Sequence, residues 1–125
     1  MHLDCIFCQI PKDRILFENN LIYAIFDGFP VTKYHSLIIP KRHIKDFFDL
    51  SEDELLLANK ILHQMKEHIL SIDESVTGFN IGMNAGESAG QTVFHCHIHL
   101  IPRRDEDVED PRGGVRHTIP GKGSY

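Results

Sequence analysis

The sequence predicts an α+β fold, and three observations support this prediction. Over residues 55–70, apolar side chains recur at the three- and four-residue spacing of an amphipathic helix. Several shorter runs are rich in branched and aromatic residues and are bounded by Asn, Gly or Pro, which is typical of strands. Residues 92–101 alternate His95, His97 and His99 with apolar residues, and this two-residue period indicates a strand with one buried face.

The strand-like runs follow one another in an order that suits an antiparallel sheet. Asn19-Asn20 separates the first two runs and predicts a turn between antiparallel strands. Pro40 ends the third run, because proline lacks the amide hydrogen that a central strand donates. Residues 5–10 form a short apolar opening, and residues 41–50 are expected to be loop with a helical turn. The five expected strands cover residues 14–18, 21–26, 36–39, 79–83 and 92–101.

The helix is expected to begin at Ser51 and to reach about residue 70. Ser51 and Glu54 have the spacing of a capping box, in which a hydroxyl and a carboxylate satisfy amides at the start of a helix. His63 and His68 lie on this segment, and we expect both to be solvated or packing residues without a chemical role.

Composition indicates a single ordinary globular domain over residues 1–125. The chain is 42% hydrophobic and 25% charged, and its formal net charge of −5 argues against a nucleic-acid partner. No apolar run approaches the ~20 residues of a membrane span, and Met1–Asp4 lacks the basic and then apolar pattern of a targeting segment. Three cysteines, an odd number, argue against a disulfide framework and favour a reducing cytoplasm.

The three histidines predict a reactive surface. In a strand, His95, His97 and His99 would share one face, while Cys96 and Ile98 would point to the opposite, apolar face. Imidazole has an ordinary pKa of about 6.5, which suits proton transfer and nucleophilic attack near neutral pH. A solvated strand face is one alternative, and a tri-histidine metal site is another. Since each strand residue rises ~3.3 Å, three rings are unsuited to one ion, but one histidine can serve a metal instead.

A polar, glycine-rich loop over residues 84–92 runs directly into the histidine strand. Glycine lets backbone amides approach an anion closely, and Asn84, Gln91 and Thr92 supply further hydrogen-bonding groups. Ordinary β-connections have the same composition. Because this loop adjoins the histidines, we interpret it as a phosphate-binding loop.

The segment Gly90–Arg103 (GQTVFHCHIHLIPR) resembles the signature of the histidine triad family, His-x-His-x-His followed by two apolar residues. The resemblance extends upstream through Asp27, the segment His35–His43 (HSLIIPKRH) and the loop at Asn84, and it covers about residues 5–103. It implies the fold of the Hint-like branch: a five-stranded antiparallel sheet with one long helix and short helical segments, extended across a homodimer. Residues 104–125 form a tail outside the resemblance.

The resemblance also implies an activity, the hydrolysis of purine nucleoside phosphoramidates or related AMP or GMP conjugates at the α-phosphate. His97 would be the nucleophile and form a covalent nucleotidyl-histidine intermediate. His99 would bind phosphate oxygens and help to protonate the leaving group, while His35 and His95 would fix the tautomer and orientation of the array. Two alternatives stay open: a dinucleoside polyphosphate hydrolase, and a nucleotide-binding or interaction module with negligible turnover.

The substrate-binding residues are likewise implied by the resemblance. Asp27 would accept hydrogen bonds from the ribose hydroxyls. Gly28 stands where many family members have an apolar residue against the base, and Phe29 is the candidate substitute. The implied phosphate contacts are Asn84, Gly90, Gln91 and Thr92, and the implied base slot is Ile6, Phe7, Ile10 and Ile25. In the tail, the cations that could reach a partner's phosphate, if they are not merely solvated, are Arg112, Arg116 and Lys122.

A second constellation begins with Cys5-x-x-Cys8. Alone, this spacing fits a redox pair or two unrelated thiols as well as a metal site. Family members that carry it also carry a histidine at the position of His43, and the resemblance implies that His43 and His95 complete a structural Zn²⁺ site. In that case His95 is structural rather than catalytic.

Overall fold

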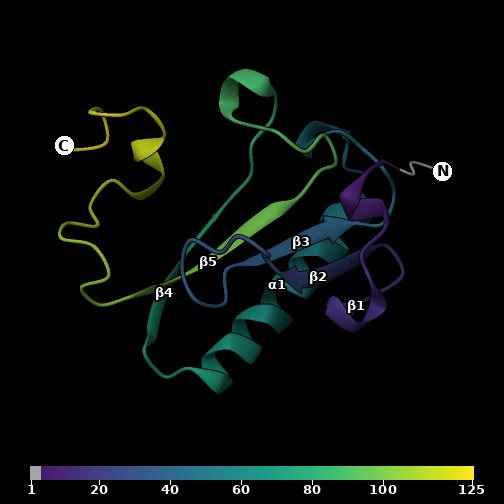
Figure 1. The fold of residues 1–125 in the computed structure, drawn as a ribbon, viewed down its shortest axis with the longest axis horizontal. Coiled ribbons are helices and arrows are strands. Elements are labelled where there is room, and N and C mark those ends of the chain that lie inside the picture. Colours follow the sequence, from purple (N-terminus) through teal and green to yellow (C-terminus); the bar gives the residue numbers. More distant parts are fainter. Residues whose placement is uncertain (1–3) are drawn as a thin grey trace.

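A computed structural model describes residues 4–125 of the chain. Met1–Leu3, which entered the prediction about targeting, lie outside the described residues. The strands are β1 (Ile15–Glu18), β2 (Ile22–Phe26), β3 (Ser36–Pro40), β4 (Val76–Gly82) and β5 (Ile98–Arg104), and the long helix is α1 (Glu52–Ile72). Short 3₁₀ turns are η1 (Ile6–Cys8), η2 (Lys12–Arg14), η3 (Phe47–Asp49), η4 (Glu87–Ala89) and η5 (Gly114–Thr118). The strands form one antiparallel sheet in the order β1-β2-β3-β5-β4 (Figure 1), which confirms the predicted fold class.

The start of α1 follows from the predicted capping box. The Ser51 hydroxyl accepts a hydrogen bond from the Glu54 amide, and a Glu54 carboxylate oxygen accepts one from the Ser51 amide. Arg42 donates two side-chain hydrogen bonds to the same carboxylate. These hydrogen bonds are the main reason that the pKa of Glu54 is lowered. A buried carboxylate at this position is stable because it faces both a cation and the positive end of the helix.

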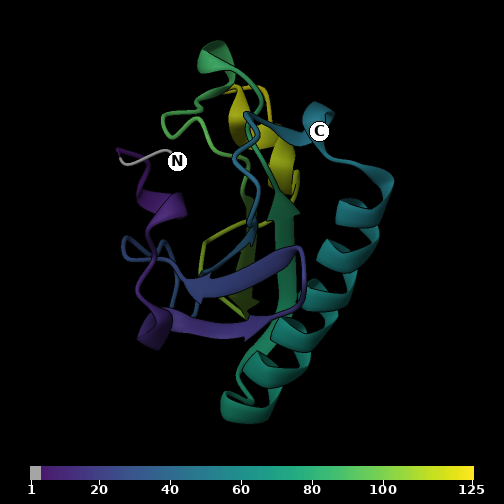
Figure 2. The ribbon, with the colours of Figure 1, turned by 90° about the vertical axis from the view of Figure 1, so that its right-hand side faces the viewer.

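The sheet has two faces, and only one of them is covered by α1. Ile22 and Ile38 pack against the apolar stripe of α1, whereas Ile25 and Leu37 point to the opposite face. There they form a second apolar cluster with Phe7, whose carbonyl accepts a hydrogen bond from the Tyr23 hydroxyl. Figure 2 shows α1 on one side of the sheet and the N-terminal segment, in purple, on the other. The face away from α1 is therefore available for a site.

The prediction of a strand over residues 92–101 was wrong at both ends, because β5 covers Ile98–Arg104. Its partner β3 ends at Pro40, which has no amide hydrogen with which to continue the ladder past the pair Ile38 and Ile98. The amide of Cys96 instead donates to the carbonyl of Ile44, at 2.7 Å. At the other end β5 extends to Arg104 because β4 begins at Val76, earlier than the predicted start at residue 79.

The tail packs beside β4, as the yellow segment in Figure 1. His117 donates a ring hydrogen bond to the carbonyl of Arg112 at 2.7 Å, and Arg112 is paired with Asp110. The guanidinium of Arg116 stands over the ring of Tyr125. Within residues 4–125, no helix is long and apolar enough to cross a membrane.

Candidate active site and metal centre

A cavity of about 610 Å³ lies on the sheet face away from α1. It brings together residues from the N-terminal segment, β2, the loop after β4 and β5. Of the residues predicted from the sequence, those that line it are Ile6, Phe7, Ile10, Ile25, Asp27, Gly28, Phe29, Asn84, Gly90, Thr92, His97 and His99. His35 is buried behind His99, and Gln91 is buried within its loop, so neither is part of the cavity wall.

The orientation of His97 leaves one ring nitrogen with a free lone pair. The Nδ1 atom lies 2.8 Å from the carbonyl oxygen of His95. A carbonyl only accepts hydrogen bonds, so the neutral His97 ring must carry its proton on Nδ1. The Nε2 atom is then unprotonated, which is the form in which imidazole acts as a nucleophile. Phe7 contacts the same ring at a centroid distance of 5.0 Å and limits its rotation.

His35 fixes the tautomer of His99 in the same way. The backbone amide of Val31 donates to Nδ1 of His35 at 3.1 Å, so the proton of neutral His35 is on Nε2. That Nε2 lies 2.9 Å from Nδ1 of His99 and 3.5 Å from a carboxylate oxygen of Asp27. His99 therefore accepts at Nδ1 and carries its own proton on Nε2, where it can be donated to a ligand.

Both rings of this pair are held neutral. Burial lowers the pKa of His35, although the Asp27 carboxylate opposes this effect. The pKa of His99 is lowered to about 4, mainly by burial and next by the charges that His97 and His35 would carry. Protonation of His35 at Nδ1 would also break its hydrogen bond with Val31, so geometry and desolvation favour the same charge state.

Mild acid is expected to destabilise the fold through these two rings. Between pH 6.5 and about 4 the unfolded chain binds protons that the folded chain excludes, so stability is full above this window and falls as pH decreases. Each proton contributes a slope of up to about 1.4 kcal/mol per pH unit. Urea denaturation from pH 7 to 4.5, in the presence of EDTA, measures the slope. His99→Asn should flatten it, and an equal slope in wild type and His99→Asn would contradict the assignment.

The cluster of Asp27, His35 and His99 is better explained as a hydrogen-bonded relay than as a metal site. Its ligand atoms lie within 4.8 Å of one another, which is compatible with a metal. A metal on Nε2 of His35 would, however, remove the only proton of that ring, because Nδ1 already accepts from Val31. An anionic imidazolate here is costly, so the proton stays.

The loop before His95 is closed by its own hydrogen bonds. The amides of Gly90 and Gln91 donate to the carbonyls of Glu87 and Gly86, at 2.9 and 3.1 Å. Gly86 and Gly90 have φ of 99° and 93°, which glycine adopts without strain. The Gln91 side chain accepts from the Gly86 amide and donates to the carbonyls of Lys45 and Val93. These bonds fix the loop, and the side chains of Asn84 and Thr92 make no hydrogen bond to another described residue, 4–125.

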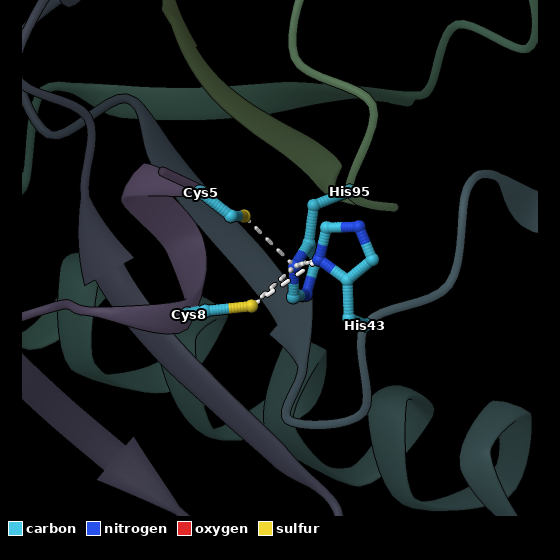
Figure 3. Close-up of side chains that lie close together, drawn as sticks. All are labelled: Cys5, Cys8, His43 and His95. Atoms are coloured by element: carbon cyan, nitrogen blue, oxygen red, sulfur yellow. Dashed lines mark hydrogen bonds between the residues drawn. The ribbon is translucent and has the colours of Figure 1, made fainter. Parts of the chain in front are cut away.

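Cys5, Cys8, His43 and His95 form a second cluster (Figure 3), and none of these four residues lines the cavity. Nδ1 of His95 lies 3.4 and 3.5 Å from the sulfur atoms of Cys5 and Cys8, and 3.2 Å from Nδ1 of His43. The Cys8 sulfur lies 3.2 Å from Nδ1 of His43. Nε2 of His95 lies 2.7 Å from the carbonyl of Pro40 and donates to it, so Nδ1 is unprotonated and faces the cluster.

These four residues fit a tetrahedral zinc ion. Zn–S bonds of ~2.3 Å and Zn–N bonds of ~2.0–2.1 Å separate neighbouring ligand atoms by about 3.3–3.8 Å, close to the distances observed here. The Pro40 carbonyl is the kind of outer partner that orients a histidine ligand. In the absence of a cation, the pKa of Cys8 is raised to about 11, mainly by desolvation and next by the adjacent Cys5 thiol. A bound metal would therefore have to displace a thiol proton.

The prediction that three imidazoles share one surface was wrong for His95. This ring is fully buried and belongs to the cysteine cluster, whereas His97 and His99 line the cavity with ring centroids 5.2 Å apart. The reason is that residues 92–97 are not a strand, so their side chains do not alternate. The inward placement of Cys96 and Ile98 is confirmed.

The cavity also contains residues that the sequence analysis did not assign, including Arg14, Leu37 and Val93. Leu37 could have been inferred, because it lies in the predicted strand 36–39, which begins directly after His35. No pattern in the sequence marks Arg14, whose position depends on how the turn before β1 folds back against β2.

The architecture has close counterparts among solved structures. A HIT family protein from Bacillus anthracis is 38% identical to this chain, with a TM-score of 0.75 and coverage of 82% of this chain and 75% of that one. A Zn-bound histidine triad family protein from Mycobacterium smegmatis is 31% identical, with a TM-score of 0.76 and coverage of 86% and 80%.

Sequence comparison agrees with the structural likeness. The adenosine 5′-monophosphoramidase of Candida albicans is 36% identical over 113 aligned positions, and the alignment covers 84% of this chain and 74% of that protein. The family model of the HIT domain matches residues 9–106, which include the cavity residues of β2 and β5 and, after β3, His43 of the Cys/His cluster. The chain belongs to the histidine triad (HIT) family.

Proposed function

We propose that the protein hydrolyses purine nucleoside phosphoramidates, or related conjugates of AMP or GMP, at the α-phosphate. The observation that carries this proposal is the hydrogen bond from Nδ1 of His97 to the His95 carbonyl, since it leaves the Nε2 lone pair free beside the proton donor His99. The family membership and the similarity to a phosphoramidase support the same reaction class.

In the proposed reaction, Nε2 of His97 attacks the α-phosphorus and the P–N bond breaks. The departing amine takes a proton from a water molecule that accepts a hydrogen bond from Nε2–H of His99, and the nucleotide is left on His97 as a covalent intermediate. The hydroxide formed from that water attacks the phosphorus, the bond to His97 breaks, and the nucleoside monophosphate is released. His35 donates to Nδ1 of His99 throughout, so His99 keeps its proton on Nε2 and stays neutral.

The remaining cavity residues suit a nucleotide. Asp27 accepts from the Phe29 amide through one oxygen, and its other lone pairs are suited to ribose hydroxyls. We propose that the side chains of Asn84 and Thr92 bind the phosphate oxygens, and that Gly90 and Gln91, whose donors are hydrogen-bonded within the loop, hold these side chains in position. The base would lie among the apolar residues Ile6, Phe7, Ile10 and Ile25.

We further propose that Cys5, Cys8, His43 and His95 hold a structural Zn²⁺. The ion would tie the N-terminal segment to residue 95, whose carbonyl orients His97. The role of the ion would be structural rather than catalytic, because protein atoms would occupy all four ligand positions of a tetrahedral ion and leave none for a substrate.

Assembly and location are also proposals. We propose a single domain over residues 1–125 that forms a homodimer through the outer edge of β4, where Ile81 is 55% exposed and, within residues 4–125, no further strand is paired. All three cysteines, Cys5, Cys8 and Cys96, are free thiols, which suits a reducing compartment such as the cytoplasm.

A small panel of substrates tests the reaction class. We expect wild-type protein to release AMP or GMP from adenosine and guanosine phosphoramidates, as measured by chromatography of the products. Diadenosine polyphosphate is the comparison substrate, and faster release from it would favour the dinucleoside polyphosphate hydrolase. Nucleotide binding without release from any substrate would contradict the proposed activity and favour a binding module.

A further inference from the structure

The cavity contains a cation that the proposed chemistry does not use. Arg14 ends η2, and its side chain lines the cavity together with Gly28. One guanidinium nitrogen, Nη2, donates to the carbonyl of Phe26 at 3.2 Å. Arg14 makes no ion pair within the described chain, residues 4–125. Since a guanidinium has five N–H donors, most of its hydrogen-bonding capacity remains available to a ligand.

Arg14 belongs to the part of the cavity where the base is expected, not to the phosphate part. It directly precedes β1, whose Ile15 is paired with Ile25 of β2, a residue of the proposed base slot. The proposed phosphate contacts come from β5 and from the loop after β4, and β5 is separated from β1 by β2 and β3 in the sheet. Arg14 is therefore close to a bound base and remote from the reacting phosphorus.

Gly28 provides the space that the guanidinium occupies. A Cβ atom at residue 28 would lie 3.8 Å from Nη2 of Arg14, which is van der Waals contact. Any branched side chain at this position would extend farther and press on the guanidinium. The pairing of Arg14 with Gly28 thus puts a planar, charged donor where a larger residue 28 would put an apolar surface.

We propose that Arg14 is a specificity-determining residue that reads the purine base and favours guanine over adenine. Guanine presents two adjacent acceptors, O6 and N7, which match the paired donors of a guanidinium. Adenine presents N7 beside an amino group, and that group is itself a donor. The inference rests on the proposed function in one respect, since it takes the bound conjugate to be a nucleotide.

Equilibrium binding of GMP and AMP, measured by calorimetry, tests this inference without any turnover. Wild type is expected to bind GMP about 5- to 20-fold more tightly than AMP. Arg14→Ala should reduce this ratio to about twofold or less. Arg14→Lys should do the same, because lysine keeps the charge but lacks the paired, planar N–H donors of a guanidinium. Lys12→Ala is the matched control, because Lys12 is an exposed cation of the same turn that does not line this cavity.

A second, independent variant perturbs the same contact from the other side. Gly28→Ile should lower the GMP preference as Arg14→Ala does, and the double variant should show no further loss, since both changes remove one interaction. The residue 28 backbone does not have a positive φ, so the substitution is compatible with the fold. Thermal melting of each variant verifies that it is folded.

Two outcomes would overturn the inference. One is an equal GMP and AMP affinity in wild type, or a preference that survives Arg14→Ala. The other is a uniform loss of affinity for both nucleotides and for inorganic phosphate, which would make Arg14 a phosphate contact. Neither bears on the reaction itself, because the substrate panel measures nucleotide release and the binding ratio does not.

Discussion

His97→Asn is expected to abolish nucleotide release while leaving nucleotide binding nearly unchanged. Asparagine removes the Nε2 lone pair, and no other ring in the cavity has the same arrangement, because the proton of His99 is on its cavity-facing nitrogen. Loss of a nucleophile lowers the rate on the order of 10⁴-fold. Single-turnover release from an adenosine phosphoramidate gives the rate, and calorimetry with AMP gives the affinity.

Intact mass spectrometry of rapidly quenched samples should reveal a nucleotidyl adduct on wild type and none on His97→Asn. His63→Asn is the matched control, since His63 is an exposed residue of α1 that lies outside the cavity. This control should retain wild-type release. Release by His97→Asn at the wild-type rate would eliminate His97 as the nucleophile.

Removal of the metal site is expected to have the largest effect on stability. Protein purified in the presence of zinc should contain about one ion per chain, and Cys5→Ser/Cys8→Ser should contain none. Zinc binding in small domains is worth on the order of 10 kcal/mol, so the double variant should melt about 10 °C lower or more. Elemental analysis and thermal denaturation are the two measurements. The rate of nucleotide release should also fall, by about 10- to 100-fold, because the His95 carbonyl that orients His97 loses its anchor.

Cys96→Ala distinguishes the metal ligands from the third thiol. Cys96 is buried in the core and lies outside the cluster of Cys5, Cys8, His43 and His95, so it is not placed to bind the proposed ion. This variant should keep its zinc and lose only a small amount of packing energy. Wild-type protein that is metal-free and as stable as the zinc-loaded form would refute the zinc proposal.

The elements that were predicted well depend on local interactions. The capping box of Ser51 and Glu54 involves residues three apart, and α1 indeed begins directly after Ser51 and ends at Ile72, two residues beyond the predicted end. The alternation of His97, Ile98 and His99 is likewise a property of a single extended segment, and it placed Ile98 in the core correctly.

The errors concern properties that depend on a distant part of the chain. The start of β5 depends on where β3 can still pair, and this ends at Pro40, 58 residues away from Ile98 in the sequence. The separation of His95 from His97 and His99 depends on the same break, because the amide of Cys96 bonds to Ile44 rather than to a strand. Neither partner is visible in the local pattern.

The sequence by itself determined the fold class, the helix and the set of side chains able to perform chemistry, because side-chain periodicity and capping are local properties of the backbone. Tertiary structure alone decided which nitrogen of each ring is free. Pro40 selects the tautomer of His95 and His35 selects that of His99, across separations of 55 and 64 residues. It also brought Arg14 beside Gly28. A hydrogen bond needs its partner within about 3 Å, and only the folded chain supplies that proximity.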